Sequence, residues 1–148
     1  MTFRAIAFLF FVVSSSARAT DWPKPNGFDC DYYLALEQHL NCQQNGSDYL
    51  VNFGYRYCMK FQEKAADWNP QLKNFINDSG LCLMEQLYDN RNSKITDCQS
   101  LEKFAFESHS ICYVQSGYCE RSVVEKLQIS ATVDWSSVFS KFGQLKNQ

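Results

Sequence analysis

The sequence predicts an all-α fold, a disulfide-stapled domain of about four to six helices. Five of its seven cysteines divide the middle of the chain into runs with helical patterning, at spacings of 24, 16, 14 and 7 residues. They are Cys58, Cys82, Cys98, Cys112 and Cys119. Within the first run, residues recur at the three- and four-residue intervals that place side chains on one helix face. They are Phe61, Ala65, Trp68, Leu72, Phe75, Ile76 and Ser79. No strand pattern of comparable strength occurs.

The first 19 residues have the parts of a secretory signal peptide. Arg4 is followed by an apolar run from Ala5 to Val13, and Ala17-Arg18-Ala19 offers a small-x-small cleavage site. The run is too short for a membrane-spanning helix, which needs about 20 residues. We therefore expect residues 1–19 to be removed and the protein to be secreted into the extracellular space.

Residues 20–148 are long enough for one domain with a hydrophobic core. Two prolines and a glycine in WPKPNG indicate an extended lead-in over residues 20–29, which leaves residues 30–148 as the helical domain. The net charge is −2 and basic residues do not cluster. This composition argues against nucleic acid or an anionic membrane as a partner.

The first half of the domain contains two expected helices. The first spans residues 30–42, and turn-forming residues at 45–48 separate it from the second, at about 49–66. Gly54 lowers the helix propensity of the second by about 1 kcal/mol relative to alanine, and a close contact with another helix would explain it. The apolar side of the first helix should consist of Tyr33, Leu34, Leu36 and Leu40.

A third helix should begin at Pro70, with Asn69 as its N-cap, and run to about residue 88. Thr96 and Gln99 have the spacing of a capping box for a fourth helix, which should reach residue 109 or 113 before Ser116-Gly117 ends it.

Two weaker helical segments follow, at residues 123–129 and 134–142. Asp134 is the expected N-cap of the last one.

The cysteines predict disulfides rather than a metal centre. The chain has no Cys-x-x-Cys motif, no Cys/His pairing at zinc spacing and no EF-hand loop, so we expect no metal or cofactor. An odd number of cysteines leaves at least one thiol for another role.

Catalysis has little support in the sequence. His109-Ser110-Ile111-Cys112-Tyr113 is similar to the His-Asp-x-Cys-Tyr stretch of secreted phospholipases A2, but Ser110 replaces the calcium-binding aspartate. No nucleophile elbow surrounds a serine, and His39 and His109 are expected to be packed or surface residues. We expect no enzyme.

The segment from Cys58 to Cys119 resembles the cysteine-rich core of the stanniocalcins, secreted glycoprotein hormones. The resemblance rests on the five-cysteine spacing and on the residues between the cysteines. These are Cys58-x-x-Phe61, Ala65-Ala66, Trp68, Gln71, Lys73, Phe75, Ser79 and Cys112-Tyr113.

The resemblance implies a set of disulfides. It implies a bond between Cys82 and Cys112 and a bond from Cys58 to an upstream cysteine, for which Cys42 is the candidate. The family partner of the Cys98 position is missing here, and Cys30 is the available substitute. Cys119 lacks its downstream family partner, which leaves it for an interchain disulfide in a homodimer, as a free or capped thiol, or for a different internal pairing.

Asn45-Gly46-Ser47 and Asn77-Asp78-Ser79 are glycosylation sequons, so Asn45 and Asn77 are the candidate acceptors. The resemblance implies a hormone that acts by binding a protein receptor or target, with a role in calcium and phosphate homeostasis. The alternative is a carrier of small lipid- or odorant-type ligands, because helical bundles of this size can enclose apolar cavities that the 12 Phe, 8 Tyr and 3 Trp could line.

Overall fold

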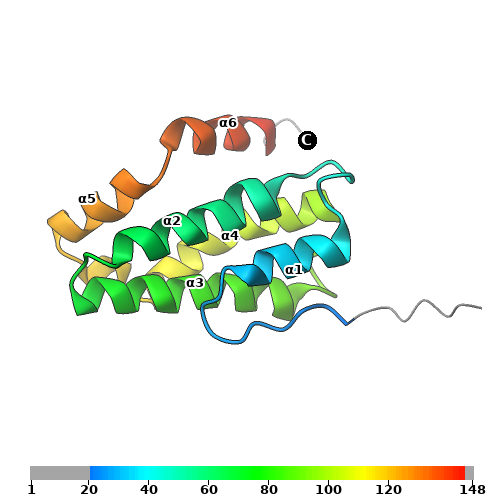
Figure 1. Ribbon diagram of the computed structural model, residues 1–148. Coiled ribbons are helices and arrows are strands. Elements are labelled where there is room, and N and C mark those ends of the chain that lie inside the picture. Colours follow the sequence, from blue (N-terminus) through cyan, green and yellow to red (C-terminus); the bar gives the residue numbers. More distant parts are fainter. Residues whose placement is uncertain (1–20, 146–148) are drawn as a thin grey trace, which may run out of the picture.

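Two helical hairpins form the centre of the protein (Figure 1). The structure is a computed structural model, and it describes residues 21–145. In the first hairpin, α1 (Asp31–Leu40) packs against η1 (Leu50–Tyr55), a π-helix that continues into α2 (Arg56–Ala65). In the second, α3 (Pro70–Asn90) packs along α4 (Cys98–Gln115). The predicted signal peptide lies outside the described residues.

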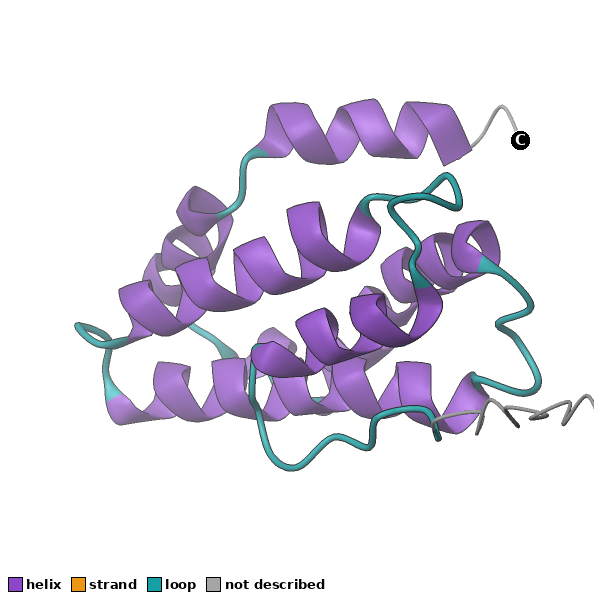
Figure 2. Ribbon diagram, turned by 45° about the vertical axis from the view of Figure 1, so that its right-hand side comes forward, coloured by secondary structure: helices purple, strands orange, loops and turns teal. Residues whose placement is uncertain are grey.

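The chain then leaves the hairpins. A short 3-10 helix η2 (Tyr118–Glu120) leads into α5 (Val123–Thr132) and α6 (Trp135–Leu145), which run over the α2 side of the bundle in Figure 1. Residues 21–145 form helices and loops and contain no strand, as Figure 2 shows. The prediction of an all-α, disulfide-stapled fold with four to six helices is confirmed.

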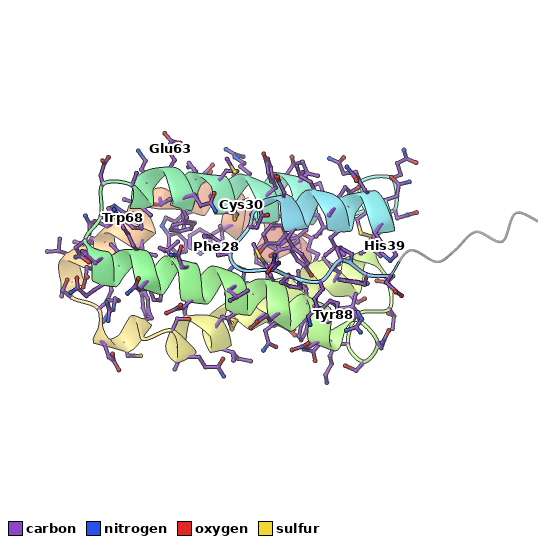
Figure 3. All side chains as sticks on the ribbon, turned by 60° about the horizontal axis from the view of Figure 1, so that its bottom comes forward. Phe28, Cys30, His39, Glu63, Trp68 and Tyr88 are labelled. Carbon is purple, nitrogen blue, oxygen red and sulfur yellow. A yellow bond between two sulfur atoms is a disulfide. The ribbon has the colours of Figure 1, made fainter. Side chains whose placement is uncertain are left out.

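The expected close contact at Gly54 is present. A β-carbon at Gly54 would lie 2.5 Å from Cδ1 of Tyr33, so only glycine lets the Tyr33 ring pack directly on η1. Gly80 likewise lets the Phe28 ring pack directly on α3, because an added β-carbon at Gly80 would lie 2.0 Å from that ring. Figure 3 shows Phe28 between α3 and the helices of the first hairpin.

Side-chain caps fix the start of the later helices. Oδ1 of Asn69 accepts a hydrogen bond from Leu72 N at 2.8 Å, as predicted. The capping box of α4 is one residue away from the predicted one, because Asp97 is the N-cap and exchanges hydrogen bonds with Ser100 at 2.8 and 3.0 Å. An aspartate is a better N-cap than the threonine beside it.

Two of the predicted disulfide pairs are wrong. The structure joins Cys82 to Cys112, the pair that the resemblance implies, but it joins Cys30 to Cys58 and Cys42 to Cys98. Cys30 and Cys42 flank opposite ends of α1. A helix of ten residues is about 15 Å long, so the two cysteines are far apart. In the hairpin Cys30 lies beside Cys58, with Cα atoms 5.6 Å apart, whereas Cys42 lies beside the start of α4.

Candidate functional site: an aromatic cavity beneath the C-terminal helices

A cavity of about 250 Å³ lies between the two hairpins and the C-terminal helices. Its bundle wall includes the aromatic rings of Phe53 and Phe106, and its cover includes Ile129 of α5 and Val138 of α6. No Asp, Glu, Lys or Arg side chain is among the described residues that line it. The cavity is therefore predominantly apolar and carries no fixed charge of its own.

Polar contacts hold the cover in place where α5 meets α6. The hydroxyl of Tyr57 on α2 accepts a hydrogen bond from Asp134 N at 3.2 Å and donates one to Asp134 O at 3.4 Å. Nζ of Lys60 donates to Thr132 O, near the end of α5, at 3.1 Å. A cation at this end of a helix also complements its dipole. Two residues of α2 thus fix the junction between the covering helices.

A second anchor ties α6 to the far end of the bundle. Lys141 pairs with Asp48, and its Nζ lies 3.4 Å from Oε1 of buried Glu102. The other oxygen of Glu102 accepts a 2.6 Å hydrogen bond from Ser47. Burial alone would lower the pKa of Lys141, but the hydrogen bond to Asp48 and the charge of Glu102 outweigh it, so its pKa is raised. The lysine stays charged and partly compensates the negative charge of the two carboxylates.

Three tyrosines bring polar groups into this apolar space. Tyr33, Tyr49 and Tyr113 all line the cavity, and Tyr33 and Tyr49 are only 4% and 3% exposed. Burial raises the pKa of Tyr113 to about 12 and the pKa values of Tyr33 and Tyr49 above their usual 10. The phenol of Tyr113 contributes in the same direction to the pKa values of the other two. All three are neutral donors and acceptors.

His109 adds an acceptor to the same wall. Its Nδ1 lies 2.8 Å from Ala105 O, and a carbonyl can only accept, so the proton belongs on Nδ1. Burial lowers the pKa of His109 below its usual 6.5, and the ring is neutral at physiological pH. Nε2 is then an unprotonated acceptor. The flanking hydroxyls of Ser108 and Ser110 donate to carbonyls of their own helix, so no serine–histidine pair forms.

Cys119 lies apart from the cavity. It is exposed in η2 and is the free cysteine of residues 21–145. The α5 helix that follows exposes three apolar side chains, Val123, Val124 and Leu127, each more than 60% exposed. An exposed thiol beside an apolar helix face is compatible with contact to a second chain.

The two sequons occupy the surface in different settings. Asn45 is exposed in the loop after α1, and Asn77 is exposed on α3. Ser47 and Ser79, which complete the sequons, are buried at 2% and 3% exposure. Both asparagine side chains are accessible, so a glycan on either would project into solvent.

The described part of the chain adds two negative findings. Across residues 21–145, His, Cys, Asp and Glu side chains do not gather in threes where they could hold a metal ion. Over the same residues no helix combines the length and apolarity needed to cross a membrane.

The sequence did not single out the cavity-lining tyrosines. Tyr33 was expected only as part of an apolar helix face, and Tyr49 and Tyr113 had no assigned role. The high aromatic content was the signal available, but it could not separate rings that fill the core from rings that border a space. His109 is packed, as expected, but in the cavity wall.

Comparison with models of protein families finds a match over most of the chain. The model of the stanniocalcin family matches residues 26–145, a range that holds all seven cysteines and every described residue of the cavity lining. No curated protein and no solved structure matches the chain.

Proposed function

This chain belongs to the stanniocalcin family, and on that premise we propose that it is a secreted hormone that acts by binding a protein receptor or target. The observation that carries the proposal is the family match over residues 26–145. The stanniocalcins are hormones rather than enzymes, and we extend to this chain their role in calcium and phosphate homeostasis.

Secretion is supported by two features. Residues 1–19 have the charge, apolar run and cleavage site of a signal peptide. Three disulfides are typical of proteins that fold in an oxidising compartment. Expression in cultured cells should deliver protein to the medium with Thr20 as its first residue, and an intact Met1 on that protein would overturn the proposed cleavage.

We further propose glycosylation at Asn45 and Asn77 and a homodimer linked through Cys119. The accessible asparagines support the first, and the exposed thiol beside the apolar face of α5 supports the second. Treatment with an N-glycosidase should lower the mass of secreted protein, and Asn45→Gln and Asn77→Gln should each remove one glycan. A mass that does not change in either variant would refute both sites.

The hormone proposal is tested on a transporting epithelium. The secreted protein is added to epithelial monolayers, and transepithelial fluxes of radiolabelled calcium and phosphate are measured together with binding of fluorescently labelled protein to the cells. The matched control is the same protein reduced and alkylated, because it keeps the composition but loses the stapled fold. Saturable binding and a changed flux with the oxidised form alone are expected, and no saturable binding would refute action through a receptor on these cells.

The carrier alternative receives no support from the family match. The cavity is the structural feature that it requires, and it is present in a member of a hormone family. A ligand site and a hormonal role do not exclude each other.

A further inference from the structure

The cavity beneath α5 and α6 has unused hydrogen-bonding capacity. No hydrogen bond among residues 21–145 involves the hydroxyls of Tyr33, Tyr49 or Tyr113. Buried polar groups in folded proteins nearly always have partners. The three phenols line one cavity and have no protein partner, so their hydroxyls are available to a ligand or to water.

The three tyrosine hydroxyls are not sealed inside packed protein. Over the described chain, Oε2 of Glu37 is the one fully enclosed side-chain oxygen or nitrogen that lacks a partner. The tyrosine hydroxyls are not fully enclosed, although the rings of Tyr33 and Tyr49 are almost completely buried. The open space that they border is the cavity that they line.

The chemistry of the walls limits what can occupy the space. Aromatic and aliphatic side chains favour a hydrocarbon body. A phenol of the lining can donate to a hydroxyl or carbonyl oxygen, and Nε2 of His109 can accept from a hydroxyl. No charged side chain of the described lining could compensate an ion, and burying an uncompensated charge is costly. A cavity of about 150 Å³ accepts benzene, so about 250 Å³ has room for a larger molecule.

We propose that this cavity is a binding site for a small neutral molecule with a hydrocarbon body and one hydroxyl or carbonyl group. The body lies against Phe53, Phe106 and the cover from α5 and α6, and the oxygen pairs with the tyrosine cluster. This inference does not depend on the proposed hormonal role, because it rests on the cavity alone.

The test uses the complete secreted protein with its disulfides intact. Fluorescence of N-phenyl-1-naphthylamine, a neutral apolar probe, is titrated, and bound probe is displaced with naphthalene, 2-naphthol and 2-naphthoate. One probe should bind per chain, and 2-naphthol should displace it at the lowest concentration. Naphthalene lacks the oxygen function, and 2-naphthoate carries a charge that the lining cannot balance.

Two kinds of variant separate the cavity from other sites. The triple change Tyr33→Phe, Tyr49→Phe and Tyr113→Phe removes the hydroxyls and keeps the rings. The affinity for 2-naphthol should therefore fall by roughly 3- to 10-fold, while the affinity for naphthalene should not change. Val133→Trp places bulk into the cavity and should abolish probe binding. Tyr55→Phe, outside the cavity lining, and Leu127→Glu, on the exposed face of α5, are the controls and should change neither affinity.

Three results would overturn the proposal. The first is absence of probe binding to wild-type protein whose circular dichroism shows the folded helical state. The second is probe binding lost in Leu127→Glu, which would place it on the surface. The third is equal displacement by naphthalene and 2-naphthol in both wild-type and triple-variant protein. Each variant is compared only after its melting curve shows cooperative unfolding, and the wild-type titration decides the question if Val133→Trp does not fold.

Discussion

Nζ of Lys141 on α6 lies 3.4 Å from Oε1 of Glu102, a buried residue of α4 that also accepts a hydrogen bond from Ser47. The same lysine pairs with Asp48 and lies 5.9 Å from the ring centroid of Phe53 in the cavity wall. One side chain thus joins the last helix, the loop after α1 and the fourth helix. The contact is therefore one of the anchors of α6, which carries part of the cavity cover.

Lys141→Met should destabilise the protein by about 1–3 kcal/mol, because it leaves the charge of Glu102 buried without its cation. A completely buried ion pair would predict a larger loss of stability, but Asp48, the other partner of Lys141, is partly exposed and solvent screens its charge. Urea unfolding of the oxidised protein measures the change. Lys103→Met, an exposed lysine on α4 next to Glu102, is the control and should be nearly neutral. Equal losses in the two variants would show that the contact contributes nothing.

Asp48 should make stability depend on acid pH. Burial alone would raise the pKa of its carboxyl, but hydrogen bonds from Lys141 and Asn52 outweigh it and hold the pKa below 3.8. A carboxyl with a lowered folded pKa stabilises the native state above its unfolded pKa, and this stabilisation is lost as pH falls through the folded pKa. Its contribution should be complete above about pH 4.

The matching experiment compares melting temperatures of wild-type protein and Asp48→Asn between pH 6 and pH 2. Wild-type protein should be more stable near pH 6, and the difference should shrink toward pH 2 as the carboxyl becomes protonated. A difference that stays constant over this range would mean that the charge of Asp48 has no part in the stability.

Gly54→Ala should destabilise the protein by about 1–3 kcal/mol, although alanine favours a helix by about 1 kcal/mol. The new methyl group would overlap the Tyr33 ring, which is buried and has little room to move. Gly143→Ala on α6 is the matched control, since nothing lies within 4 Å of its added β-carbon, and it should be neutral or stabilising. Thermal melts compare the two. A stabilised Gly54→Ala would contradict the packing of Tyr33 on η1.

The disulfide arrangement can be read by peptide mapping. Trypsin cannot separate Cys30 from Cys42, because the chain has no lysine or arginine between them, but a glutamate-specific protease cleaves after Glu37. Digestion of alkylated, non-reduced protein with both enzymes should link the peptide that ends at Glu37 to residues 57–60, and residues 38–56 to the peptide that contains Cys98. A link between residues 38–56 and 57–60 would restore the pairing that the family resemblance implied.

Cys119 is tested by intact mass in the presence and absence of reductant. The proposed dimer predicts a species of twice the chain mass that collapses on reduction and disappears in Cys119→Ser. The variant should keep its three internal disulfides and its melting temperature, which separates loss of the dimer from loss of the fold. A wild-type monomer with a free or capped Cys119 would refute the interchain bond.

Much of the fold could be predicted from local signals. Helix periodicity, the Asn69-Pro70 start and the Ser116-Gly117 stop depend on interactions within a few residues, and the structure has helices at each of these places. Where two neighbouring residues could both cap a helix, the sequence pattern did not decide between them. Thr96 and Asp97 could both cap α4, and the aspartate does. The close contact at Gly54 was expected, but the π-helical form of η1 was not foreseen.

The sequence by itself determined the helical class, the framework of cysteines and the family, because each depends on spacing along the chain. Only the tertiary structure decided which cysteines meet, where the last two helices lie and whether the aromatic residues leave a space between them. Those features depend on how hairpins orient one helix end against another and on how side chains from distant segments fill a shared volume. Tyr33, Tyr49 and Tyr113 look like ordinary core residues in the sequence. They become a candidate site only when α1, the N-cap of η1 and α4 bring these residues to the same cavity.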